Sequence, residues 1–442
     1  MLRRAVGVGA LAAGAATLVA VALAVGAVTV VVGTRLAASN VPGRDGDDRC
    51  GPAWSAAWQA SPQALPPAQP LAGRTLRMIV RPQVTGSQVR VRLSNRFGTA
   101  PLLLGQVSVA RAATGAALVP GTVRPVTFGR PIVPPGAELI SDPVPVVAEA
   151  GQPLAVSLVL PRTPDVVDEH PVALQTSYLS GPGDASLATD GGAFTTPLGS
   201  WLVLTGVEVL TPRPVNAVVT MGDSITDGVG SGIDTDTRWS DALSARLARR
   251  GGPATMAVLN GGISRNELLA DSGETGESPS TRIGREVVAV PTATDVVLHI
   301  GTNDIAAGRS APEIIDGMTR FAGLARAAGR RVFLTTITPS TNGEHGTRRA
   351  RAVRDEVNRW VRERGRYHGD GVFDFAAAVA DPKDPARLQR RYDAGDGLHL
   401  SGAGYRALAG TVDVTRLTGS PCLARAASGA DRTPSRVALA GG

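Results

Sequence analysis

Two patterns of apolar and polar residues divide the chain, and the first covers residues 50–211. In SQVRVRLSN, Val89, Val91 and Leu93 alternate with polar residues, and TLRMIVRP, PLAVSLVLP and SWLVLTGVEVL are similar runs. Prolines and glycines separate these runs, and no longer stretch has convincing helical periodicity. A period of two is typical of half-buried strands. We therefore predict an all-β sandwich, of jelly-roll type, over residues 50–211.

The second pattern begins after Pro214, where short apolar runs alternate with runs of helical periodicity. The expected strands are VNAVVTM, ATMAVLN, TDVVLHIG, RRVFLTTITP and GVFDF. The expected helices are RWSDALSARLARR, PEIIDGMTRFAGLARAAG, the arginine-rich segment 348–366 and GAGYRALAGTV. Strands that alternate with helices predict a parallel sheet covered on both faces. Residues 212–417 are thus expected to form an α/β domain.

The N-terminal segment differs from both patterns. Arg3 and Arg4 precede an uncharged stretch, residues 5–32. This stretch exceeds the roughly 7–15 residues of a secretory h-region and reaches the roughly 20 needed to span a membrane. Residues 1–35 are therefore expected to be a transmembrane signal anchor with a cytoplasmic N-terminus, or a signal peptide cleaved near Ala38. Both alternatives place the following residues outside the cytoplasm, either on the cell membrane or secreted.

The two ends of the folded part are polar or rich in small residues. Residues 36–49 are aperiodic and contain glycine, so they are expected to be a linker. From residue 418 to residue 442 the chain is rich in Ala, Ser, Gly and Arg, and we expect a fraying C-terminal tail.

The formal net charge of +7 comes almost entirely from arginine, because Lys383 is the only lysine. The arginines are scattered, and no basic run is interleaved with aromatic residues, so nucleic acid is not an expected partner. The densest cluster, 348–366, is expected to be a helix with a solvated charged face; contact with an anionic wall polymer or lipid headgroup is the alternative. The apolar stripe of this helix comprises Val353, Val357, Trp360 and Val361.

The chain has two cysteines, Cys50 and Cys422, without metal-ligand spacing. In an oxidising compartment, an even pair of cysteines favours a disulfide. The alternative is two free thiols. A bond between them would link the start of the β domain to the end of the α/β domain.

Four polar segments lie where strands of the α/β domain are expected to end. They are GDSITDG with Ser224, NGGIS at 260–264, GTND at 301–304, and DGLHLS with Asp396 and His399. Each segment alone has an ordinary explanation as a cap, turn or loop. Because functional groups gather at the carboxyl ends of parallel strands, together they supply a serine, a base, a carboxylate and hydrogen-bond donors. These are the requirements of acyl transfer.

In this order, the four segments resemble the sequence blocks of the SGNH (GDSL-type) hydrolase family. The resemblance covers about 212–417 and implies a flavodoxin-like α/β/α fold. It also implies that Ser224 is the nucleophile, that His399 is the general base and that Asp396 orients the histidine. The implied oxyanion donors are the backbone N–H groups of Ser224 and Gly262 and the side-chain amide of Asn303.

The chain departs from the family pattern at two positions, and some roles have rival candidates. Ile225 replaces the leucine of the family's GDSL motif, which is a conservative change. Arg265 stands where another small residue is expected, which puts the local loop shape in doubt. Asp393 is the alternative to Asp396 as the orienting carboxylate. Among the other histidines, His299 is expected in the core and His345 is a candidate to line the cleft, while His170 and His368 have no motif around them.

The segments CGPAWSAAW and TSYLSGPGDA resemble, more loosely, the β-sandwich domain that precedes the catalytic domain in some secreted actinobacterial-type members of the family. Trp54 and Trp58 are expected to anchor the interface between the domains. A platform on which sugars stack is the alternative.

These features predict an extracytoplasmic serine ester hydrolase that acts through an acyl-enzyme on Ser224. The expected substrate is a short acyl ester, such as an O-acetyl group on an envelope or extracellular glycan, with small lipid esters as the second choice. No metal-ligand cluster, phosphate loop or dinucleotide fingerprint is present, so no cofactor is expected. The alternatives are an acyltransferase that uses a glycan hydroxyl and a non-catalytic envelope-binding protein.

Overall fold

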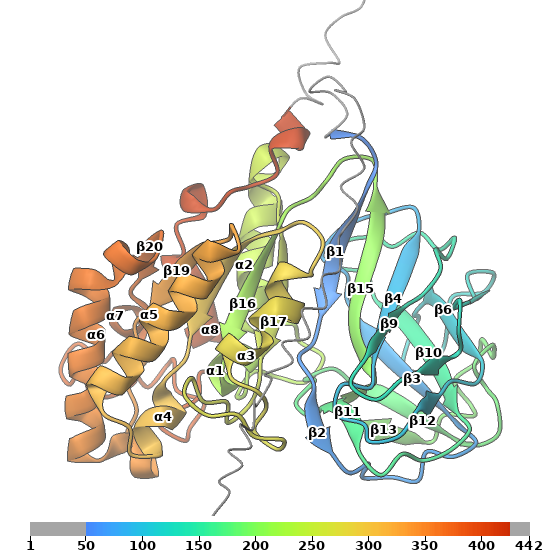
Figure 1. The fold of residues 1–442 in the computed structure, drawn as a ribbon, viewed down its shortest axis with the longest axis horizontal. Coiled ribbons are helices and arrows are strands. Elements are labelled where there is room, and N and C mark those ends of the chain that lie inside the picture. The colour runs from blue at the N-terminus through green and yellow to red at the C-terminus, as the bar shows by residue number, and fades with distance from the viewer. Residues whose placement is uncertain (1–49, 425–442) are drawn as a thin grey trace, which may run out of the picture. The chain divides into compact units, whose positions relative to one another are not determined.

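The computed structural model describes residues 50–424, which belong to one compact unit (Figure 1). We call residues 50–211 the β region and residues 212–424 the α/β region. The predicted anchor and linker at 1–49, and the tail beyond residue 424, lie outside the described residues. Within residues 50–424, no helix is both long and apolar enough to cross a membrane.

The β region consists of antiparallel strands. The two larger sheets have the strand orders β1-β15-β4-β9 and β13-β12-β3-β10-β6-β7, and the smaller ones are β14-β11-β2 and β5-β8. The strands are β1 (Ala53–Gln59), β2 (Gln63–Leu65), β3 (Arg74–Val80), β4 (Val89–Ser94), β5 (Leu102–Leu103), β6 (Val107–Arg111), β7 (Arg124–Pro125), β8 (Ile132–Val133), β9 (Glu138–Ile140), β10 (Leu154–Leu160), β11 (Val167–His170), β12 (Ser177–Pro182), β13 (Thr196–Leu198), β14 (Trp201–Leu202) and β15 (Leu204–Thr211).

The alternation in β4 decides which side chains of that strand are buried. Val89, Val91 and Leu93 are fully buried, whereas Arg90 and Arg92 between them are partly exposed. The valines and the leucine belong to the same hydrophobic core as residues of β3 and β10, which lie in the other large sheet. The predicted antiparallel β domain is therefore present, with apolar residues of both large sheets in one core.

The α/β region contains a parallel sheet with the strand order β17-β16-β18-β19-β20. This order is that of a flavodoxin-like sheet and agrees with the predicted fold. The strands are β16 (Ala217–Gly222), β17 (Ala257–Gly262), β18 (Ala293–His299), β19 (Arg331–Thr335) and β20 (Gly371–Phe373). The helices are α1 (Ser224–Asp227), α2 (Trp239–Arg250), α3 (Pro279–Ile283), α4 (Thr302–Ala306), α5 (Ala311–Ala327), α6 (Arg348–His368), α7 (Phe375–Val379) and α8 (Gly402–Thr411).

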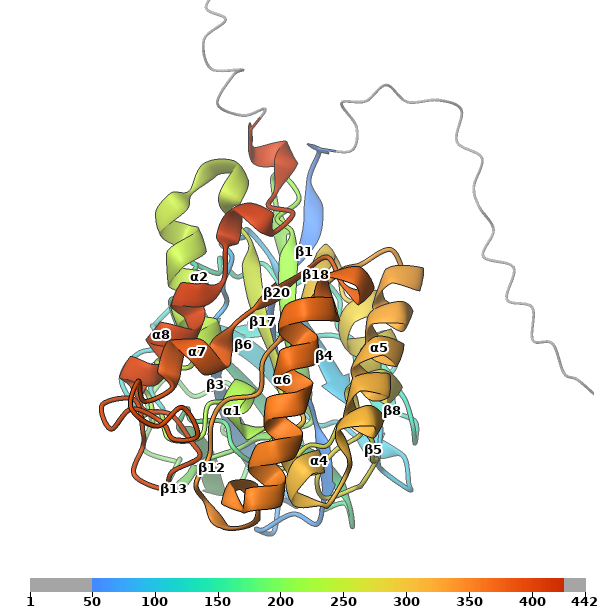
Figure 2. The same ribbon diagram turned by 90° about the vertical axis from the view of Figure 1, so that its left-hand side faces the viewer.

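Consecutive residues of the parallel strands enter different hydrophobic clusters, because side chains of a strand alternate between its faces. Val218 packs with α2, α7 and α8, whereas Val219 belongs to the cluster that contains α5 and α6. Figure 2 shows these two groups of helices on either side of the sheet. In α6, Val357 and Val361 are buried, and Val353 and Trp360 pack partly against the core. The predicted apolar stripe is therefore confirmed.

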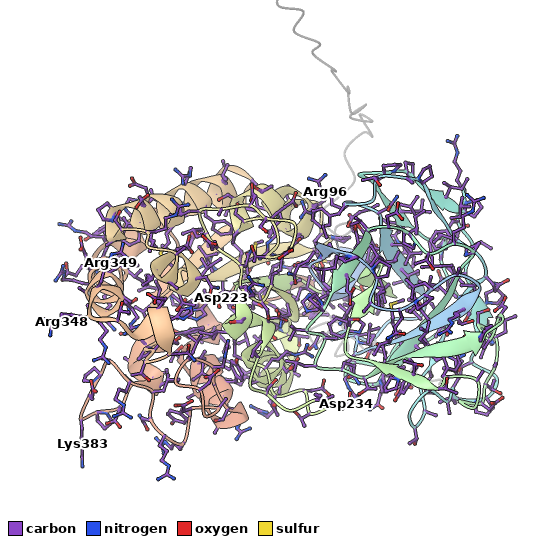
Figure 3. All side chains as sticks on the ribbon, turned by 90° about the horizontal axis from the view of Figure 1, so that it is seen from below. Arg96, Asp223, Asp234, Arg348, Arg349 and Lys383 are labelled. Carbon is purple, nitrogen blue, oxygen red and sulfur yellow. A yellow bond between two sulfur atoms is a disulfide. The ribbon has the colours of Figure 1, made fainter. Side chains whose placement is uncertain are left out.

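The charged face of α6 lies at the periphery of the α/β region. Figure 3 shows that Arg348, Arg349 and Lys383 lie at the outer edge of this region, whereas Asp223 lies well inside it. Arg348 and Arg349 are exposed to solvent. The exposed arginines thus agree with a solvated helix face.

The two regions share one hydrophobic core and are joined by buried polar contacts. Strand β1 packs beside β17, and one cluster of buried apolar side chains includes residues of both regions. Ser61 of the β region donates its hydroxyl hydrogen to Glu286 at 2.6 Å and accepts a hydrogen bond from the buried Arg282 at 2.9 Å. Arg282 also pairs with Glu286 at 2.5 Å. A buried ion pair whose polar atoms all have hydrogen-bond partners therefore lies at the boundary between the two regions.

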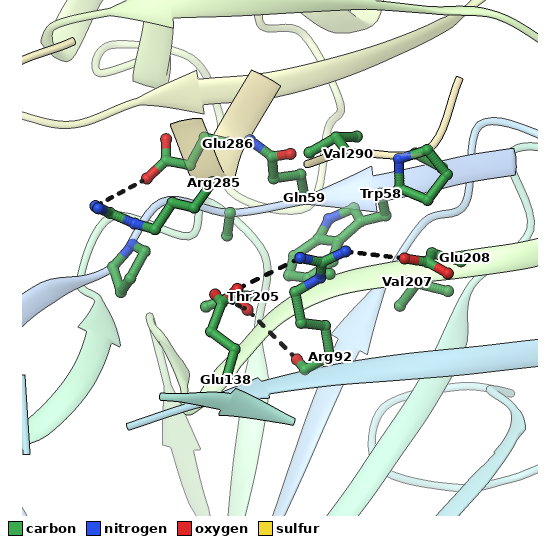
Figure 4. A pocket seen from close by; sticks show the side chains of 15 residues that line it. Trp58, Gln59, Arg92, Glu138, Thr205, Val207, Glu208, Arg285, Glu286 and Val290 are labelled. Carbon is green, nitrogen blue, oxygen red and sulfur yellow. Dashed lines mark hydrogen bonds and ion pairs between the residues drawn. The ribbon is translucent and has the colours of Figure 1, made fainter. Parts of the chain in front are cut away.

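A small cavity of about 30 Å³ lies beside this contact, between β1, β15 and the turn after α3 (Figure 4). Arg92 pairs there with Glu208 at 2.9 Å, and Arg285 pairs with Glu286 at 3.4 Å. The cavity is close to the size of a single water molecule and its charged walls are already paired. It therefore belongs to the packing between the regions.

A disulfide between Cys50 and Cys422 confirms the predicted pairing, with the two Cα atoms 5.2 Å apart. The chain beside Cys422 does not fray, although the tail was expected to begin at residue 418. Ser420 is buried and donates to the carbonyl of Thr255 at 2.6 Å, and Asn216 donates to the carbonyl of Gly419 at 2.7 Å. The disulfide ties residues 418–422 to the start of the β region, and these bonds hold them against the rest of the α/β region.

Reduction of this disulfide is expected to lower the thermal stability of the protein while leaving turnover at moderate temperature largely intact. The two cysteines are 372 residues apart in sequence. For such a loop the chain-entropy treatment allows at most about 6 kcal/mol of stabilisation. Calorimetry and an activity assay on oxidised and reduced protein check this expectation. A parallel loss of activity at moderate temperature would show that the bond also supports the site.

Candidate active site

Ser224 lies at a sharp turn between β16 and α1. The turn requires Gly222, because a Cβ atom there would come within 2.1 Å of the carbonyl oxygen of His299. Asp223 caps the helix by accepting the Ile225 N–H at 3.0 Å. Helix α1 ends at Asp227, and Gly228 follows with φ of 108°. The turn therefore presents the serine at the carboxyl end of the central part of the sheet.

Ser224, His399 and Asp396 form one chain of hydrogen bonds. The distance from Ser224 Oγ to His399 Nε2 is 2.8 Å, and that from His399 Nδ1 to Asp396 Oδ2 is 2.6 Å. Because a carboxylate accepts, Nδ1 carries the hydrogen, which leaves Nε2 free to accept the serine hydrogen. The structure thus brings together the three residues that the sequence predicted for nucleophile, base and orienting carboxylate.

Asp396 is held in place by the backbone as well as by the histidine. Its Oδ1 accepts the N–H groups of Leu398 at 2.9 Å and His399 at 2.8 Å. Partial burial raises the pKa of Asp396, but the hydrogen bonds from His399 and Leu398 outweigh this effect and leave the pKa lowered. The carboxylate therefore stays ionised and keeps the histidine in the required tautomer.

Asp393, the rival to Asp396, has another role in the same loop. Its Oδ1 accepts the N–H groups of Gly395 at 2.7 Å and Gly397 at 3.0 Å. Gly395 and Gly397 both have positive φ, so these bonds stabilise a turn that only glycine adopts easily. Asp393 thus shapes the loop that carries Asp396.

The backbone N–H of Gly262, predicted as an oxyanion donor, is already used within the protein. It donates to Asn260 Oδ1 at 2.9 Å, and Asn260 in turn donates to the carbonyl of Thr226 at 2.9 Å. A Cβ atom on Gly262 would lie 2.1 Å from the backbone nitrogen of Asp227. The structure therefore explains Gly262 by the close approach of β17 to α1, and not by a free donor.

The loop at 263–266 follows directly and supplies a free backbone donor. Arg265 has a positive φ of 68°, a conformation that favours glycine, and its N–H has no acceptor among residues 50–424. Ser264 N and Oγ both donate to Asp227 Oδ2, at 2.9 and 2.6 Å. On the other side, Asn266 is fully buried and accepts from Arg282 at 3.2 Å. The sequence had signalled this loop, because Arg265 stands where the family pattern has a small residue.

Asn303, at the start of α4, is positioned by two partners. Its Nδ2 donates to the carbonyl of Asn266 at 2.9 Å, and its Oδ1 lies 3.3 Å from His345 Nε2. An amide oxygen only accepts, so His345 must donate from Nε2. Burial and the nearby His399 lower the pKa of His345, which favours the neutral ring. The second Nδ2 hydrogen has no acceptor among the described side chains and backbone, so it is free to bind substrate.

Two buried carboxyl groups lie in and near the serine turn. Asp304 accepts the N–H groups of Leu268 at 2.9 Å and Leu269 at 3.0 Å, while Asp223 caps α1. Burial raises the pKa of Asp304 to about 6. Burial, together with the charges of Asp304 and Asp227, raises the pKa of Asp223 to about 7. These groups support the backbone around the site and do not contact its reacting atoms.

Two further histidines are buried: His299 lies in the core as predicted, and His170 makes a contact that the sequence did not predict. His299 is buried, and its Nδ1 lies 2.7 Å from the Thr335 hydroxyl. Burial lowers the pKa of His299 to about 3, as suits the predicted core position. His170 of the β region is also buried, but its ring nitrogens contact Ser61 and Asp227. No local motif indicated this contact.

A larger cavity of about 320 Å³ lies at the boundary between the two regions. Trp58 lines it but is buried, with its ring edge-on to Trp201 at 4.9 Å. Trp54 is covered by the Arg90 guanidinium at 4.0 Å. Trp58 is thus buried beside the boundary cavity, whereas Trp54 contacts an arginine of the β region itself. Among residues 50–424, no group of three or more His, Cys, Asp or Glu side chains is placed to hold a metal ion.

The Asn303→Ala substitution removes one hydrogen-bond donor from the site and is expected to change the kinetic constants. We expect kcat to fall by roughly 100- to 1000-fold, the usual effect of losing a single oxyanion donor. KM should change much less, because the interaction strengthens chiefly in the transition state. Steady-state kinetics with a chromogenic ester measure both constants. A near-normal kcat would mean that Asn303 serves only to hold the 263–266 loop.

Comparison with known proteins agrees with the resemblance found in the sequence. Residues 220–407 match the sequence profile of the GDSL-like Lipase/Acylhydrolase family. This segment is therefore a GDSL-like lipase/acylhydrolase domain, preceded by a β-rich region. No curated protein sequence matches the chain.

Solved structures that match part or most of this chain include three bacterial proteins. The lipase/acylhydrolase from Enterococcus faecalis is 22% identical, with 46% of this chain and 96% of that chain covered and a TM-score of 0.37. A member of the lipolytic protein G-D-S-L family from Veillonella parvula is 20% identical, with 46% and 100% covered and a TM-score of 0.35. A family two carbohydrate esterase from Clostridium thermocellum, solved with cellohexaose, is 13% identical, with 83% and 93% covered and a TM-score of 0.36.

Proposed function

We propose that the protein is an extracytoplasmic serine ester hydrolase that forms an acyl-enzyme on Ser224. The observation that carries this proposal is the hydrogen-bonded chain from Ser224 Oγ through His399 to Asp396, with distances of 2.8 and 2.6 Å. The chain lies at the carboxyl ends of parallel strands, within a GDSL-like lipase/acylhydrolase domain.

In the first half of the reaction, Ser224 Oγ attacks the carbonyl carbon of the ester. Its proton moves to His399 Nε2, while Asp396 holds the opposite ring nitrogen and stabilises the imidazolium. The tetrahedral intermediate then collapses, the bond to the alcohol oxygen breaks, and His399 gives its proton to that oxygen. The alcohol leaves and the acyl group remains on Ser224.

In the second half, His399 takes a proton from a water molecule that attacks the acyl-enzyme. The new tetrahedral intermediate collapses, and the proton returns from His399 to Ser224 Oγ. A carboxylic acid is released and the free serine is restored. An acyltransferase would use a glycan hydroxyl in place of water at this step.

The developing oxyanion would be bound by three donors. Ser224 N–H and Arg265 N–H have no acceptors among residues 50–424, and Asn303 has one free amide hydrogen. In this proposal Arg265 replaces Gly262, whose N–H is bound to Asn260. Preorganised donors of this kind commonly make the largest single contribution to acyl transfer. We call the 263–266 segment the oxyanion loop.

The triad is buried at its serine and open to solvent at its carboxylate. Ser224 is only 6% exposed, but the side chain of Asp396 is 43% exposed and that of His399 is 17% exposed. The histidine that protonates the leaving group is therefore partly accessible to solvent. We propose a short acyl ester of a sugar hydroxyl, such as an O-acetyl group on an envelope or extracellular glycan, ahead of small lipid esters.

The proposed location outside the cytoplasm is supported by the disulfide and by the N-terminal sequence. Disulfides persist in oxidising compartments and are rare in the cytosol, and Cys50–Cys422 closes the described chain. Residues 5–32 carry no charge and follow two arginines. We propose that this segment attaches the protein to the cell membrane or directs its secretion.

The test is a screen of p-nitrophenyl esters of increasing acyl length, followed by acetylated glycans, with the Ser224→Ala variant as the blank. We expect turnover to be fastest with acetate and to decline with longer chains. Product analysis with and without a glycan acceptor separates hydrolysis from acyl transfer. Equal rates for the wild type and the blank on every ester would reject the catalytic proposal and favour a binding protein.

A further inference from the structure

His170 is the one residue of the β region whose side chain contacts the helix that begins at Ser224, among the described hydrogen bonds. Its Nε2 lies 3.0 Å from Asp227 Oδ1, and its Nδ1 lies 2.9 Å from the carbonyl oxygen of Ser61. The ring also stacks on Trp201, with centroids 5.5 Å apart. The side chain of His170 is 6% exposed and that of Asp227 is 2% exposed. The pair is thus enclosed at the boundary of the two regions.

Both ring nitrogens of His170 face acceptors. A carbonyl oxygen can only accept, so Nδ1 carries a hydrogen, and the Asp227 carboxylate requires a hydrogen on Nε2 as well. Asp227 Oδ2 already accepts two hydrogen bonds from Ser264, as suits an ionised carboxylate. The geometry therefore fits an imidazolium paired with a carboxylate. Breaking such a buried pair by removing one partner is costly, because the other charge is left uncompensated.

Asp227 connects this pair to two parts of the proposed catalytic machinery. It is the last residue of α1, three residues after Ser224. Its Oδ2 fixes both the N–H and the hydroxyl of Ser264, which precedes Arg265 in the oxyanion loop. One carboxylate thus ties the nucleophile's helix to the loop that supplies an oxyanion donor, and His170 fixes the orientation of that carboxylate.

We propose that His170 is a positioning residue through which the β region holds the oxyanion loop in its active geometry, and that the protonated ring does this best because it donates to Ser61 and Asp227 at once. This inference rests on the proposed ester hydrolysis at Ser224. The β region then helps to maintain the geometry of the active site and is not an independent domain that only binds the cell envelope. His170 itself contacts no reacting atom.

The proposal predicts loss of activity at alkaline pH. Burial lowers the pKa of His170, but the Asp227 charge and the hydrogen bonds to Asp227 and Ser61 outweigh it, so the pKa is raised overall. The other charged groups that face the ring are Arg238, which disfavours the imidazolium, and Glu169, which favours it. A raised pKa means that the charge pair with Asp227, and one of the two ring hydrogen bonds, are present at low pH and are lost as pH rises through that pKa.

The experiment compares His170→Phe and His170→Gln with a matched control, Arg81→Gln, in the full protein. Phenylalanine keeps a ring against Trp201 but cannot donate to Asp227, whereas glutamine supplies a neutral donor that does not titrate. The control removes another ion pair between the regions, Arg81 with Asp236 at 2.8 Å, which has no bond to the oxyanion loop. The substrate is p-nitrophenyl acetate, and kcat and KM are measured from acid to alkaline pH.

We expect His170→Phe to lower kcat by about 10- to 100-fold, the scale of a small misplacement in a catalytic site, with little change in KM. Arg81→Gln should stay within about 2-fold of the wild type, as is usual away from such features. His170→Gln should keep much of the activity and lose the alkaline decline. A purely structural role would leave the shape of the pH profile unchanged.

Hydrogen exchange supplies a readout that does not depend on substrate. The Ser264 amide should exchange faster in His170→Phe than in the wild type and in Arg81→Gln, because its acceptor Asp227 is released. Equal kcat in His170→Phe and Arg81→Gln, or an alkaline decline that persists in His170→Gln, would overturn the proposal. If the wild type hydrolyses no ester while the exchange difference is present, the hydrolase function fails and the positioning role of His170 stands.

Discussion

Replacement of Ser224 by alanine is expected to abolish ester turnover and labelling by a fluorophosphonate probe. Without the Oγ atom no acyl-enzyme can form, and the remaining donors and His399 provide only weak background catalysis. Loss of the triad serine costs roughly 10⁶-fold in kcat in a well-studied serine hydrolase. The fold should be unaffected, because the serine hydroxyl has only His399 as a hydrogen-bond partner among the described residues.

A matched control is available close to the site. Ser231 donates its hydroxyl hydrogen to the carbonyl of Gly228 at 2.8 Å and has no contact with the triad. Ser231→Ala should therefore keep labelling and turnover near wild-type levels. Mass spectrometry of the labelled protein identifies the modified residue. Labelling that persists in folded Ser224→Ala protein would rule out Ser224 as the nucleophile.

The sequence predicted well those features that depend on the pattern of apolar and polar residues within a single strand or helix. The alternation in β4 and the apolar stripe of α6 report which face of an element is buried, and the structure buries those residues. The triad could be predicted because the segments around Ser224, Asp396 and His399 resemble, in order, sequence blocks of the SGNH family. The disulfide followed from having only two cysteines in a chain expected to be exported.

The oxyanion donor could not be predicted in the same way. A backbone N–H is free only if no acceptor lies in front of it, and this depends on the φ angle of its residue and on the neighbouring groups. The residue type reveals neither of these. Gly262 is a glycine because β17 and α1 approach closely, and its N–H is taken by Asn260. Arg265 has the φ of 68° that glycine would adopt more easily, yet it carries a long side chain.

His170 was missed for a different reason, which is distance along the chain. Its two partners, Ser61 and Asp227, are 109 and 57 residues away. Ser61 meets His170 within the folded β region, and Asp227 meets it only when the β region packs on the α/β region, so no spacing in the sequence reveals either contact. The same packing explains why the two predicted domains share one hydrophobic core. An interface of this kind makes the β region part of the site's support.

The second large effect is expected at His399, and it separates the base from its orienting carboxylate. His399→Ala should be nearly as damaging as Ser224→Ala, because residues that act as a unit are strongly non-additive. Asp396→Ala should be on the order of 100-fold less damaging, because it removes orientation and imidazolium stabilisation and leaves the base in place.

Asp396→Asn tests the tautomer directly. An asparagine amide can donate to His399 Nδ1, which would move the ring hydrogen to Nε2 and prevent it from accepting the Ser224 proton. We therefore expect Asp396→Asn to be at least as harmful as Asp396→Ala, although it is the closer replacement in shape. Asp393→Ala is the matched control, because the Asp393 carboxylate accepts from Gly395 and Gly397 in the same loop and has no described hydrogen bond to His399. Steady-state kinetics of the four variants decide the order, and a larger loss in Asp393→Ala than in Asp396→Ala would move the orienting role to Asp393.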